Sequence, residues 1–349
     1  MDDQHLNDWF NKRKERRQQL NANSLLEGIL SKNVATLSSA ITLLESSRND
    51  DRFIAKELVN LCLPHAGNSI RIGITGVPGV GKSTFIEAFG KVLLQEGKRI
   101  AVLAIDPSSE LSGGSILGDK TRMEELSQME NVFIRPSPAG KTLGGVAKKT
   151  RESILLCEAA GFDIILIETV GVGQSETMVH SMVDFFLLLM LSGAGDELQG
   201  IKRGIMEMAD TLVITKADGD NLQKAKLASR EYQNALHLFP PNQNEWIPKS
   251  LICSATTGDN IGKIAEIIHS FVNHTKVNGW FEKKRNSQDK FWFHETLKEF
   301  IFNQFFGNKD VVKEIEEIEI EITEGKISSF QAAEEVFKHY LNNLNGTSI

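Results

Sequence analysis

The segment GVPGVGKST at 76–84 restricts the fold most, because it stands between an apolar run and a helical pattern. It follows IRIGIT at 70–75 and matches the phosphate-loop pattern G-x-x-x-x-G-K-[ST]. Its glycines allow positive φ angles and a close approach of the main chain to an anion. Successive N–H groups can point inward as a nest, and the following helix adds the partial positive charge of its N-terminus. The pattern predicts a strand, a loop and a helix that hold the phosphates of a nucleoside triphosphate.

The side chains of this loop have separate expected roles. Lys82 is expected to contact the β- and γ-phosphates, which makes it a catalytic candidate, and the Ser83 hydroxyl is expected to ligate Mg²⁺. A glycine turn without a ligand is the alternative, and the flanking strand and helix disfavour it. The predicted nucleotide-binding residues of the loop are Gly76, Val77, Pro78, Gly79, Val80, Gly81, Lys82, Ser83 and Thr84.

Between about 70 and 275, short β-rich runs recur and helical stretches separate most of them. The runs are IRIGIT (70–75), RIAVLAID (99–106), VFIRPS (132–137), DIILIET (163–169), DFFLLLML (184–191), TLVITKAD (211–218) and KSLICSA (249–255). Strands that alternate with helices form right-handed crossovers and a mostly parallel sheet covered on both faces. We therefore predict an α/β fold of the P-loop NTPase class, with its sheet flanked by helices.

The flanking parts of the chain carry helical patterns. We predict a helical N-terminal extension at 1–65, a P-loop nucleotide domain at 66–275 and a helical C-terminal arm at 276–349. The alternation in EIEIEI could also indicate a strand. Its Glu-rich flanks and helical neighbours favour a helix.

Charge and composition exclude several classes of partner. The net charge of −7 disfavours general nucleic-acid binding, which depends on Lys and Arg to neutralise phosphates. The basic run KRKERR at 12–17 is interpreted as a solvated helix face. MVDFFLLLML at 182–191 is too short to span a bilayer and is predicted to be a buried strand. We expect a cytoplasmic protein without a signal peptide, and no metal-ligand spacing or disulfide framework among Cys62, Cys157 and Cys253.

A triphosphate site also needs carboxylates to hold Mg²⁺ or its water ligands. Asp106 ends the run RIAVLAID and Glu168 lies at the end of DIILIET, so both are expected at the carboxyl edge of the parallel sheet. We predict that both residues bind the metal ion and take part in catalysis, and that Asp119 also binds the metal ion. Gly171 follows Glu168 by three residues, a spacing at which a main-chain N–H can meet a γ-phosphate. This loop is expected to respond to the nucleotide state.

The run TKAD at 215–218 resembles the guanine-reading motif NKxD. Asp218 can accept hydrogen bonds from guanine N1–H and the exocyclic amine, whereas adenine presents the opposite pattern. Lys216 is expected along the base face. Thr215 stands where the motif has Asn, which removes an amide that normally braces the loop. A second base-side loop, SAT, follows another strand, so GTP is favoured over ATP and the set includes Ser254, Ala255 and Thr256.

Taken together, these segments resemble the methylmalonyl-CoA mutase-associated GTPase family, MeaB-like proteins also known as ArgK or LAO/AO transport kinases. The resemblance covers nearly the whole chain. Its marks are GVPGVGKST, AIDPSS, SGGSILGDKTRM, TLGG (142–145), ETVGVGQSE, GDELQGIKRG (195–204), TKAD and SAT. The combination is more discriminating than a phosphate loop alone.

The resemblance implies a GTP-hydrolysing chaperone of an adenosylcobalamin-dependent acyl-CoA mutase, with methylmalonyl-CoA mutase as the default partner and isobutyryl-CoA or related mutases as alternatives. Such a chaperone gates cofactor loading and protects or reactivates the mutase, with its adenosyltransferase as a further partner, and binds no cobalamin itself. By motif match, Asp106, Asp119 and Glu168 join Ser83 at the Mg²⁺ site, while 106–122 and 170–178 correspond to switches. The loop GDELQGIKRG corresponds to a partner-responsive segment with the polar contacts Asp196 and Lys202. The C-terminal helices correspond to a homodimerisation arm.

We expect slow intrinsic hydrolysis, because no arginine finger or glutamine is evident beyond Gln174, which is a candidate only by its position. Three alternatives remain. The first is an ATP-dependent kinase linked to amino-acid transport, against which Asp218 argues. The second is a nucleotide-gated scaffold without useful hydrolysis. The third, a metallochaperone GTPase, normally needs a Cys/His cluster, and Cys157 and Cys253 have no such neighbours in the sequence.

Overall fold

The computed structural model describes residues 21–46, 48–105, 123–136, 143–169, 175–193 and 203–346. The chain divides into two compact units, Met1–Arg285 and Asn286–Ile349, and each has its own core. The division predicted from the sequence, at 65/66 and 275/276, stays a prediction.

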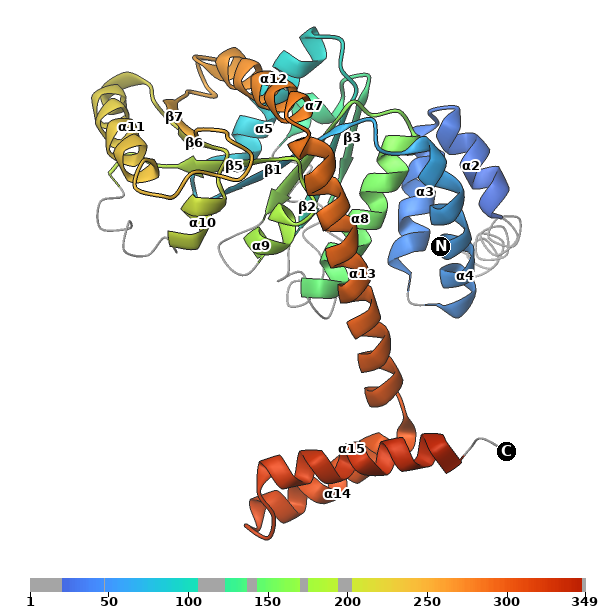
Figure 1. Cartoon of the computed structure of the whole chain (residues 1–349). Coiled ribbons are helices and arrows are strands. Elements are labelled where there is room, and N and C mark those ends of the chain that lie inside the picture. Colours follow the sequence, from blue (N-terminus) through green and yellow to red (C-terminus); the bar gives the residue numbers. More distant parts are fainter. Residues whose placement is uncertain are drawn as a thin grey trace, which may run out of the picture. The chain divides into compact units, whose positions relative to one another are not determined.

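The described residues of the first unit form one seven-stranded parallel sheet (Figure 1). Its order is β3-β2-β4-β1-β5-β6-β7, and every neighbouring pair is parallel. All seven predicted runs contain one of its strands, which confirms the predicted fold class. The strands are β1 Ile70–Gly76, β2 Ile100–Ile105, β3 Val132–Arg135, β4 Ile164–Thr169, β5 Phe185–Met190, β6 Thr211–Ile214 and β7 Lys249–Ile252.

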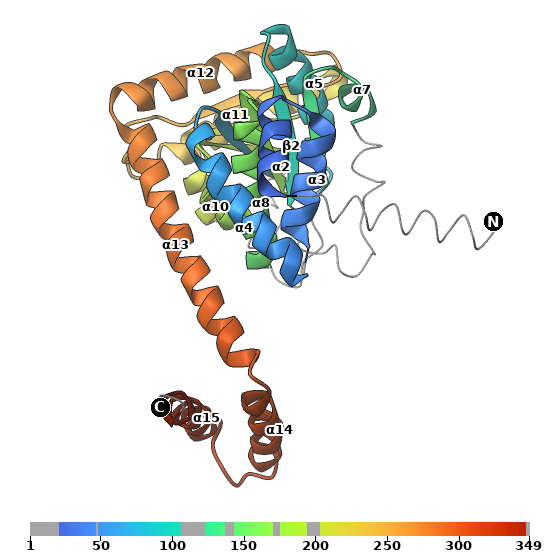
Figure 2. The same cartoon turned by 90° about the vertical axis from the view of Figure 1, so that its right-hand side faces the viewer.

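Helices cover both faces of this sheet, because the central strands are apolar on both sides. Leu187 and Leu189 of β5 belong to one core cluster, together with the helices α5 and α12 and with Leu126 of α7. Leu188 and Met190 belong to the other, together with α10 and α11. Figure 2 shows α5, α7 and α12 on a common side. The bounds are α5 Lys82–Gln95, α7 Glu124–Ser127, α8 Leu143–Ala159, α9 Ser175–His180, α10 Arg203–Met208, α11 Leu222–Leu236 and α12 Ile261–Val277.

The N-terminal extension is helical in its described part, as predicted. It consists of α2 Ala22–Leu30, α3 Val34–Glu45, α4 Asn49–Cys62 and a 3-10 turn, Leu63–His65. Asn33 caps α3 by accepting a hydrogen bond from the Thr36 N–H at 3.0 Å. These helices pack against α8, and Arg135 at the end of β3 forms an ion pair with Glu45.

The amino-terminal edge of the sheet is closed by aspartates that come directly before a strand. Asp163 accepts from the Arg99 N–H at 2.7 Å, Asp184 from the Arg71 N–H at 2.8 Å and Asp210 from the Phe186 N–H at 2.9 Å. Each aspartate thus satisfies a main-chain donor at the start of the neighbouring strand. Because these polar groups at the amino-terminal edge hold neighbouring strands together, the opposite, carboxyl-terminal edge is the one open to a ligand.

Arg285, at the end of the first unit, is anchored to the same amino-terminal edge. Its guanidinium donates to both carboxylate oxygens of Asp184, at 2.8 and 2.7 Å, and to the carbonyl oxygens of Gly67 and Ser69 at 2.6 Å. Its planar group also lies 4.5 Å from the centre of the Phe281 ring. The pair with Asp184 is almost fully buried, with 11% and 1% of the two side chains exposed.

The second unit is helical. Helix α13 (Trp280–Phe306) runs into it, and α14 (Lys309–Thr323) and α15 (Ser329–Gly346) follow. EIEIEI lies in α14, so the predicted helix is confirmed. A small core of Val311, Val336 and Tyr340 holds these helices together, while several large apolar side chains stay exposed. Among the described residues, no helix is both long and apolar enough to cross a bilayer.

Candidate functional site

The phosphate loop connects β1, in the middle of the sheet, to the N-terminus of α5. Gly81 precedes the first helical residue with φ of 89°, a left-handed conformation that favours glycine. Gly76 ends β1, where an added Cβ would lie 2.3 Å from the Leu189 carbonyl oxygen of β5. The glycine spacing of the motif therefore matches two separate steric needs, and it leaves the amino end of a helix facing the carboxyl edge of the sheet.

The two polar side chains that open α5 are already engaged. The Lys82 ammonium donates to the Gly76 carbonyl oxygen at 2.9 Å and lies 3.5 Å from that of Val77. The Ser83 hydroxyl donates to Glu168 Oε1 at 3.2 Å. Among the loop residues, Val80 is buried, while Pro78 and Thr84 are exposed. The lysine that ends the loop thus contacts the carbonyl oxygens at its beginning.

Glu168 reaches Ser83 because β4 lies beside β1. Ile74 of β1 pairs with Glu168 in the parallel register, and only 5% of Glu168 is exposed. A hydroxyl and a carboxylate are the oxygen donors that Mg²⁺ prefers, and phosphate oxygens and water complete such a site. The pair therefore fits a divalent cation. The other predicted acids, Asp106 and Asp119, lie outside the described residues, as does Gly171.

The base-side loop TKAD begins where β6 ends and lies against the phosphate loop. The Thr215 hydroxyl donates to the Val80 carbonyl oxygen at 2.7 Å, and the Lys216 ammonium donates to that of Gly79 at 2.8 Å. Lys216 has φ of 55°, a left-handed conformation that costs a non-glycine residue energy. The amide expected at position 215 is absent, but the hydroxyl found there does contact the phosphate loop.

Asp218 and the SAT loop are in contact through hydrogen bonds. Ser254, fully buried, donates its hydroxyl to Asp218 Oδ2 and accepts from the Thr257 N–H at 3.1 Å. The Ala217 N–H donates to the Cys253 carbonyl oxygen at 3.0 Å, which joins the two loops through the main chain. Asp218 is partly exposed, Ala255 is partly buried and Thr256 is exposed, so this face is accessible to a base.

Asn221 is a part of this site that sequence reasoning missed. Its amide donates to the Lys216 carbonyl oxygen at 2.7 Å, and its Oδ1 accepts from the Ser192 hydroxyl at 2.6 Å. It therefore ties the left-handed Lys216 to the end of β5. The available signal was the polar run GDN directly after TKAD, which is typical of a turn held by side-chain hydrogen bonds.

The predicted switches are described only in part. All of 106–122 and residues 170–174 of the second switch lie outside the described residues, as do Asp196 and Lys202. The second switch continues into α9, and the predicted partner-responsive segment continues into α10. These two helices pack against each other.

His180, at the end of α9, is a buried titratable group close to this region. Its ring meets the Phe186 ring edge-on, with 5.5 Å between centroids. Burial, helped by the nearby Lys284 ammonium, lowers the pKa of His180 to about 3. The imidazole is therefore neutral at physiological pH.

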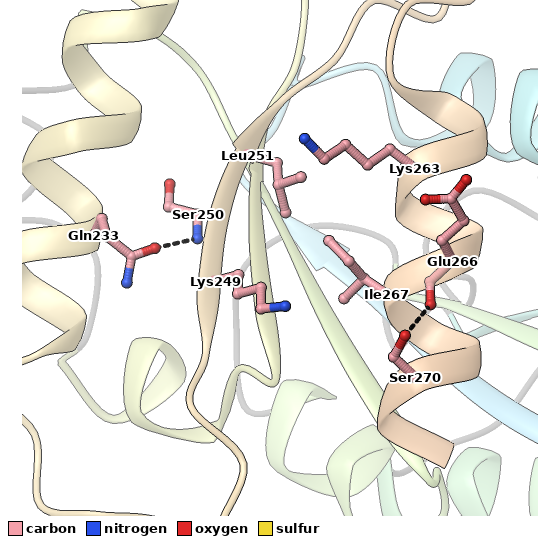
Figure 3. Close-up of a pocket in the computed structure, with 8 residues that line it drawn as sticks. All are labelled: Gln233, Lys249, Ser250, Leu251, Lys263, Glu266, Ile267 and Ser270. Atoms are coloured by element: carbon pink, nitrogen blue, oxygen red, sulfur yellow. Dashed lines mark hydrogen bonds between the residues drawn. The ribbon is translucent and has the colours of Figure 1, made fainter. Parts of the chain in front are cut away.

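A separate hollow lies at the outer edge of the sheet, between α11, β7 and α12 (Figure 3). Two hydrogen bonds join residues that line it: the Ser250 N–H donates to Gln233 Oε1 at 2.7 Å, and the Ser270 hydroxyl donates to the Glu266 carbonyl oxygen at 2.8 Å. None of the described residues predicted to bind nucleotide lines this hollow. It is therefore not the candidate site.

Comparison with known proteins agrees with this geometry. Residues 37–310 match the family model described as "Methylmalonyl Co-A mutase-associated GTPase MeaB". A Caulobacter vibrioides protein named "Putative GTPase" is 48% identical over 90% of this chain and 96% of its own length. The mouse protein "Methylmalonic aciduria type A homolog, mitochondrial" is 44% identical over 90% of this chain and 79% of its own length.

Among solved structures, the chain is similar to one described as "Crystal structure of LAO/AO transport system kinase". The TM-score is 0.73 at 35% sequence identity, and the match covers 92% of this chain and 97% of the other. The similarity therefore includes the fold and most of the length of both chains.

Proposed function

Because the chain belongs to the MeaB family of methylmalonyl-CoA mutase-associated GTPases and is itself a GTPase, we propose that it is a GTP-driven chaperone of an adenosylcobalamin-dependent acyl-CoA mutase. Methylmalonyl-CoA mutase is the proposed partner, because the family description names it. The chaperone would gate cofactor loading and protect or reactivate the mutase, with the adenosyltransferase as a further partner. We propose a cytoplasmic protein that binds neither nucleic acid nor membrane.

Guanine specificity is assigned to Asp218. Its carboxylate is partly exposed and is held by Ser254 at the carboxyl edge of the sheet. A carboxylate accepts from N1–H and the exocyclic amine of guanine together, whereas adenine offers no such pair of donors. Ala255, Thr256 and the stem of Lys216 would complete the base pocket.

The phosphates are assigned to the loop 76–84 and to Lys82. Lys82 now donates to the Gly76 carbonyl oxygen, a position from which a short movement of its side chain would bring it to a phosphate. Ser83 and Glu168 would hold Mg²⁺ together with Asp106 and Asp119, and the main-chain N–H of Gly171 would contact the γ-phosphate. When bound, the cation neutralises negative charge on the phosphates.

Hydrolysis would rest on positioning and charge stabilisation. Lys82 and the inward N–H groups of the loop would stabilise charge that develops on the phosphates. We propose slow turnover until a partner orders the residues that orient the attacking water, with Gln174 as a candidate. Packing between α9 and α10 supports a route from the second switch to the partner-responsive loop that contains Asp196 and Lys202.

The second unit is proposed as a homodimerisation arm. Several of its large apolar side chains are more than half exposed, among them Phe300 at 61% and Phe330 at 81%. Its small core leaves this apolar surface for a second copy to cover.

The observation that carries the proposal is the meeting of the phosphate loop, Thr215 and Asp218 in a chain of this family. The test is GTP hydrolysis by the full chain, with and without the mutase. We expect slow turnover that the mutase accelerates, and a loss of about a hundredfold or more in Lys82→Ala. Lys224→Ala, an exposed lysine on α11, is the control. Equal turnover with and without the mutase would contradict the chaperone role.

An ATP-dependent kinase is the second candidate, because a solved relative is named as a transport system kinase. The same assay tests it with ATP in place of GTP and an amino acid or protein as acceptor. Transfer of phosphate to the acceptor, with ATP preferred, would favour the kinase. Tight GTP binding with no turnover under any condition would favour a nucleotide-gated scaffold.

A further inference from the structure

Two carbonyl oxygens of the phosphate loop accept hydrogen bonds from side chains of the base-side loop. Thr215 donates to the Val80 carbonyl oxygen and Lys216 to that of Gly79. A trans peptide unit points its C=O and N–H in opposite directions. A carbonyl that is fixed outward therefore turns the next residue's N–H inward. The Thr215 contact therefore acts on the Gly81 N–H. The Lys216 contact acts on the Val80 N–H, which donates to the Val77 carbonyl oxygen at 3.2 Å within the loop.

We infer that Thr215 is a positioning residue for the phosphates and not a reader of the base. Its hydroxyl fixes the Val80–Gly81 peptide unit, so nucleotide affinity depends on it while the choice between guanine and adenine does not. This inference rests on the proposed function of the site as a GTP site.

The surroundings of Thr215 make the contact rigid. The residue is 4% exposed, and its own N–H donates to the Met190 carbonyl oxygen of β5 at 2.9 Å. The hydroxyl has one proton, and the Val80 oxygen at 2.7 Å is closer to it than the Met190 oxygen at 3.3 Å. Val80 itself is 1% exposed, so water does not readily replace the hydroxyl as donor.

Base reading uses a different set of contacts. Asp218 is held by the Ser254 hydroxyl, and Ala217 by the Cys253 carbonyl oxygen. These bonds come from the loop after β7, whereas the Thr215 bond goes to the loop after β1. The two functions can therefore be separated by substitution.

The test compares Thr215→Val, which keeps the shape and loses the hydroxyl, with Thr215→Ser, which keeps the hydroxyl. Thr211→Val is the matched control, because Thr211 begins β6, the strand that Thr215 follows, is fully buried and donates to the Asp210 carbonyl oxygen outside the phosphate loop. We expect Thr215→Val to weaken GTP and GDP about tenfold. The ratio of GTP to ATP affinity should stay that of the wild type. Thr215→Ser should remain within about threefold of the wild type.

Amide hydrogen exchange in the protein without nucleotide provides a second readout that needs no GTP. In Thr215→Val the N–H groups of 79–82 should exchange faster, while those of β6 stay as in the wild type. Unchanged exchange and unchanged affinity in Thr215→Val would overturn the inference, as would a changed GTP to ATP ratio. If the wild type binds no GTP but the exchange result is obtained, the proposed function fails and the positioning role of Thr215 stands.

Discussion

Ser83 donates a hydrogen bond to Glu168 across 3.2 Å, which joins the first turn of α5 to the carboxyl end of β4. These residues are 85 positions apart in the chain and meet because β1 and β4 are neighbours. The contact brings together two oxygen donors of the proposed Mg²⁺ site.

Ser83→Ala is expected to weaken the binding of Mg²⁺. Loss of the hydroxyl removes one proposed ligand and one partner of Glu168, so the Mg²⁺ concentration for half-maximal GTP hydrolysis should rise about ten- to a hundredfold. The measurement is turnover against Mg²⁺ concentration at saturating GTP. Ser270→Ala, which removes an exposed hydroxyl of α12 that donates to the Glu266 carbonyl oxygen, should leave the curve in place.

Asp218→Asn is expected to change the preferred base from guanine to xanthine. Xanthine has a carbonyl where guanine has the exocyclic amine, and an amide side chain can donate to this carbonyl while it accepts from N1–H. GTP affinity should fall at least about a hundredfold, and XTP should bind better than GTP in competition. Asp220→Asn, on the exposed residue two positions later, is the control. GTP affinity retained in Asp218→Asn would remove Asp218 from the base pocket.

His180 is expected to make the protein less stable in acid. Its pKa in the folded state is about 3, below the ordinary value of 6.5, so only the unfolded chain takes up this proton as the pH falls between the two values. The free energy of unfolding should decrease by about 1.4 kcal/mol per pH unit in this window. His180→Leu should lack this component. The measurement is the difference between the wild-type and variant urea curves at pH 7 and pH 5, in which contributions from other groups cancel.

Arg285→Ala is expected to destabilise the first unit strongly. It would leave the Asp184 carboxylate, whose side chain is 1% exposed, without its cation. Breaking one partner from a buried pair costs about 3–5 kcal/mol. Lys298→Ala is the control, since it breaks an exposed pair with Glu295 and should cost less than about 1 kcal/mol. Chemical unfolding followed by Trp fluorescence measures both, and similar losses for the two variants would show that the Asp184 pair is not the anchor.

The sequence predicted those structural features that a single continuous segment of the chain determines. The apolar runs predicted every described strand, because a strand buried on both faces needs a continuous apolar stretch. Ends were less accurate: DIILIET and DFFLLLML each begin with an aspartate that the structure places before the strand. These aspartates bond to the neighbouring strand, so their place is set by a partner that the local sequence does not reveal.

Contacts between distant segments could not be predicted. Arg285 and Asp184 are 101 positions apart, and Arg135 and Glu45 are 90 apart. Neither pair belongs to a motif with fixed spacing. Thr215 is an intermediate case: the motif revealed the departure from Asn, but its contact with Val80 depends on β6 and β1 being brought to the same edge of the sheet.

The side chain of Gln233 bonds to the main chain of β7, the strand at one end of the sheet order. It accepts from the Ser250 N–H and donates to the Pro248 carbonyl oxygen, as the main chain of an additional strand beside β7 would do. A strand from another molecule would have to displace the Gln233 side chain before it could pair with β7 at these positions. The Gln233 side chain thereby makes β7 a poorer template for an added strand at these two main-chain groups.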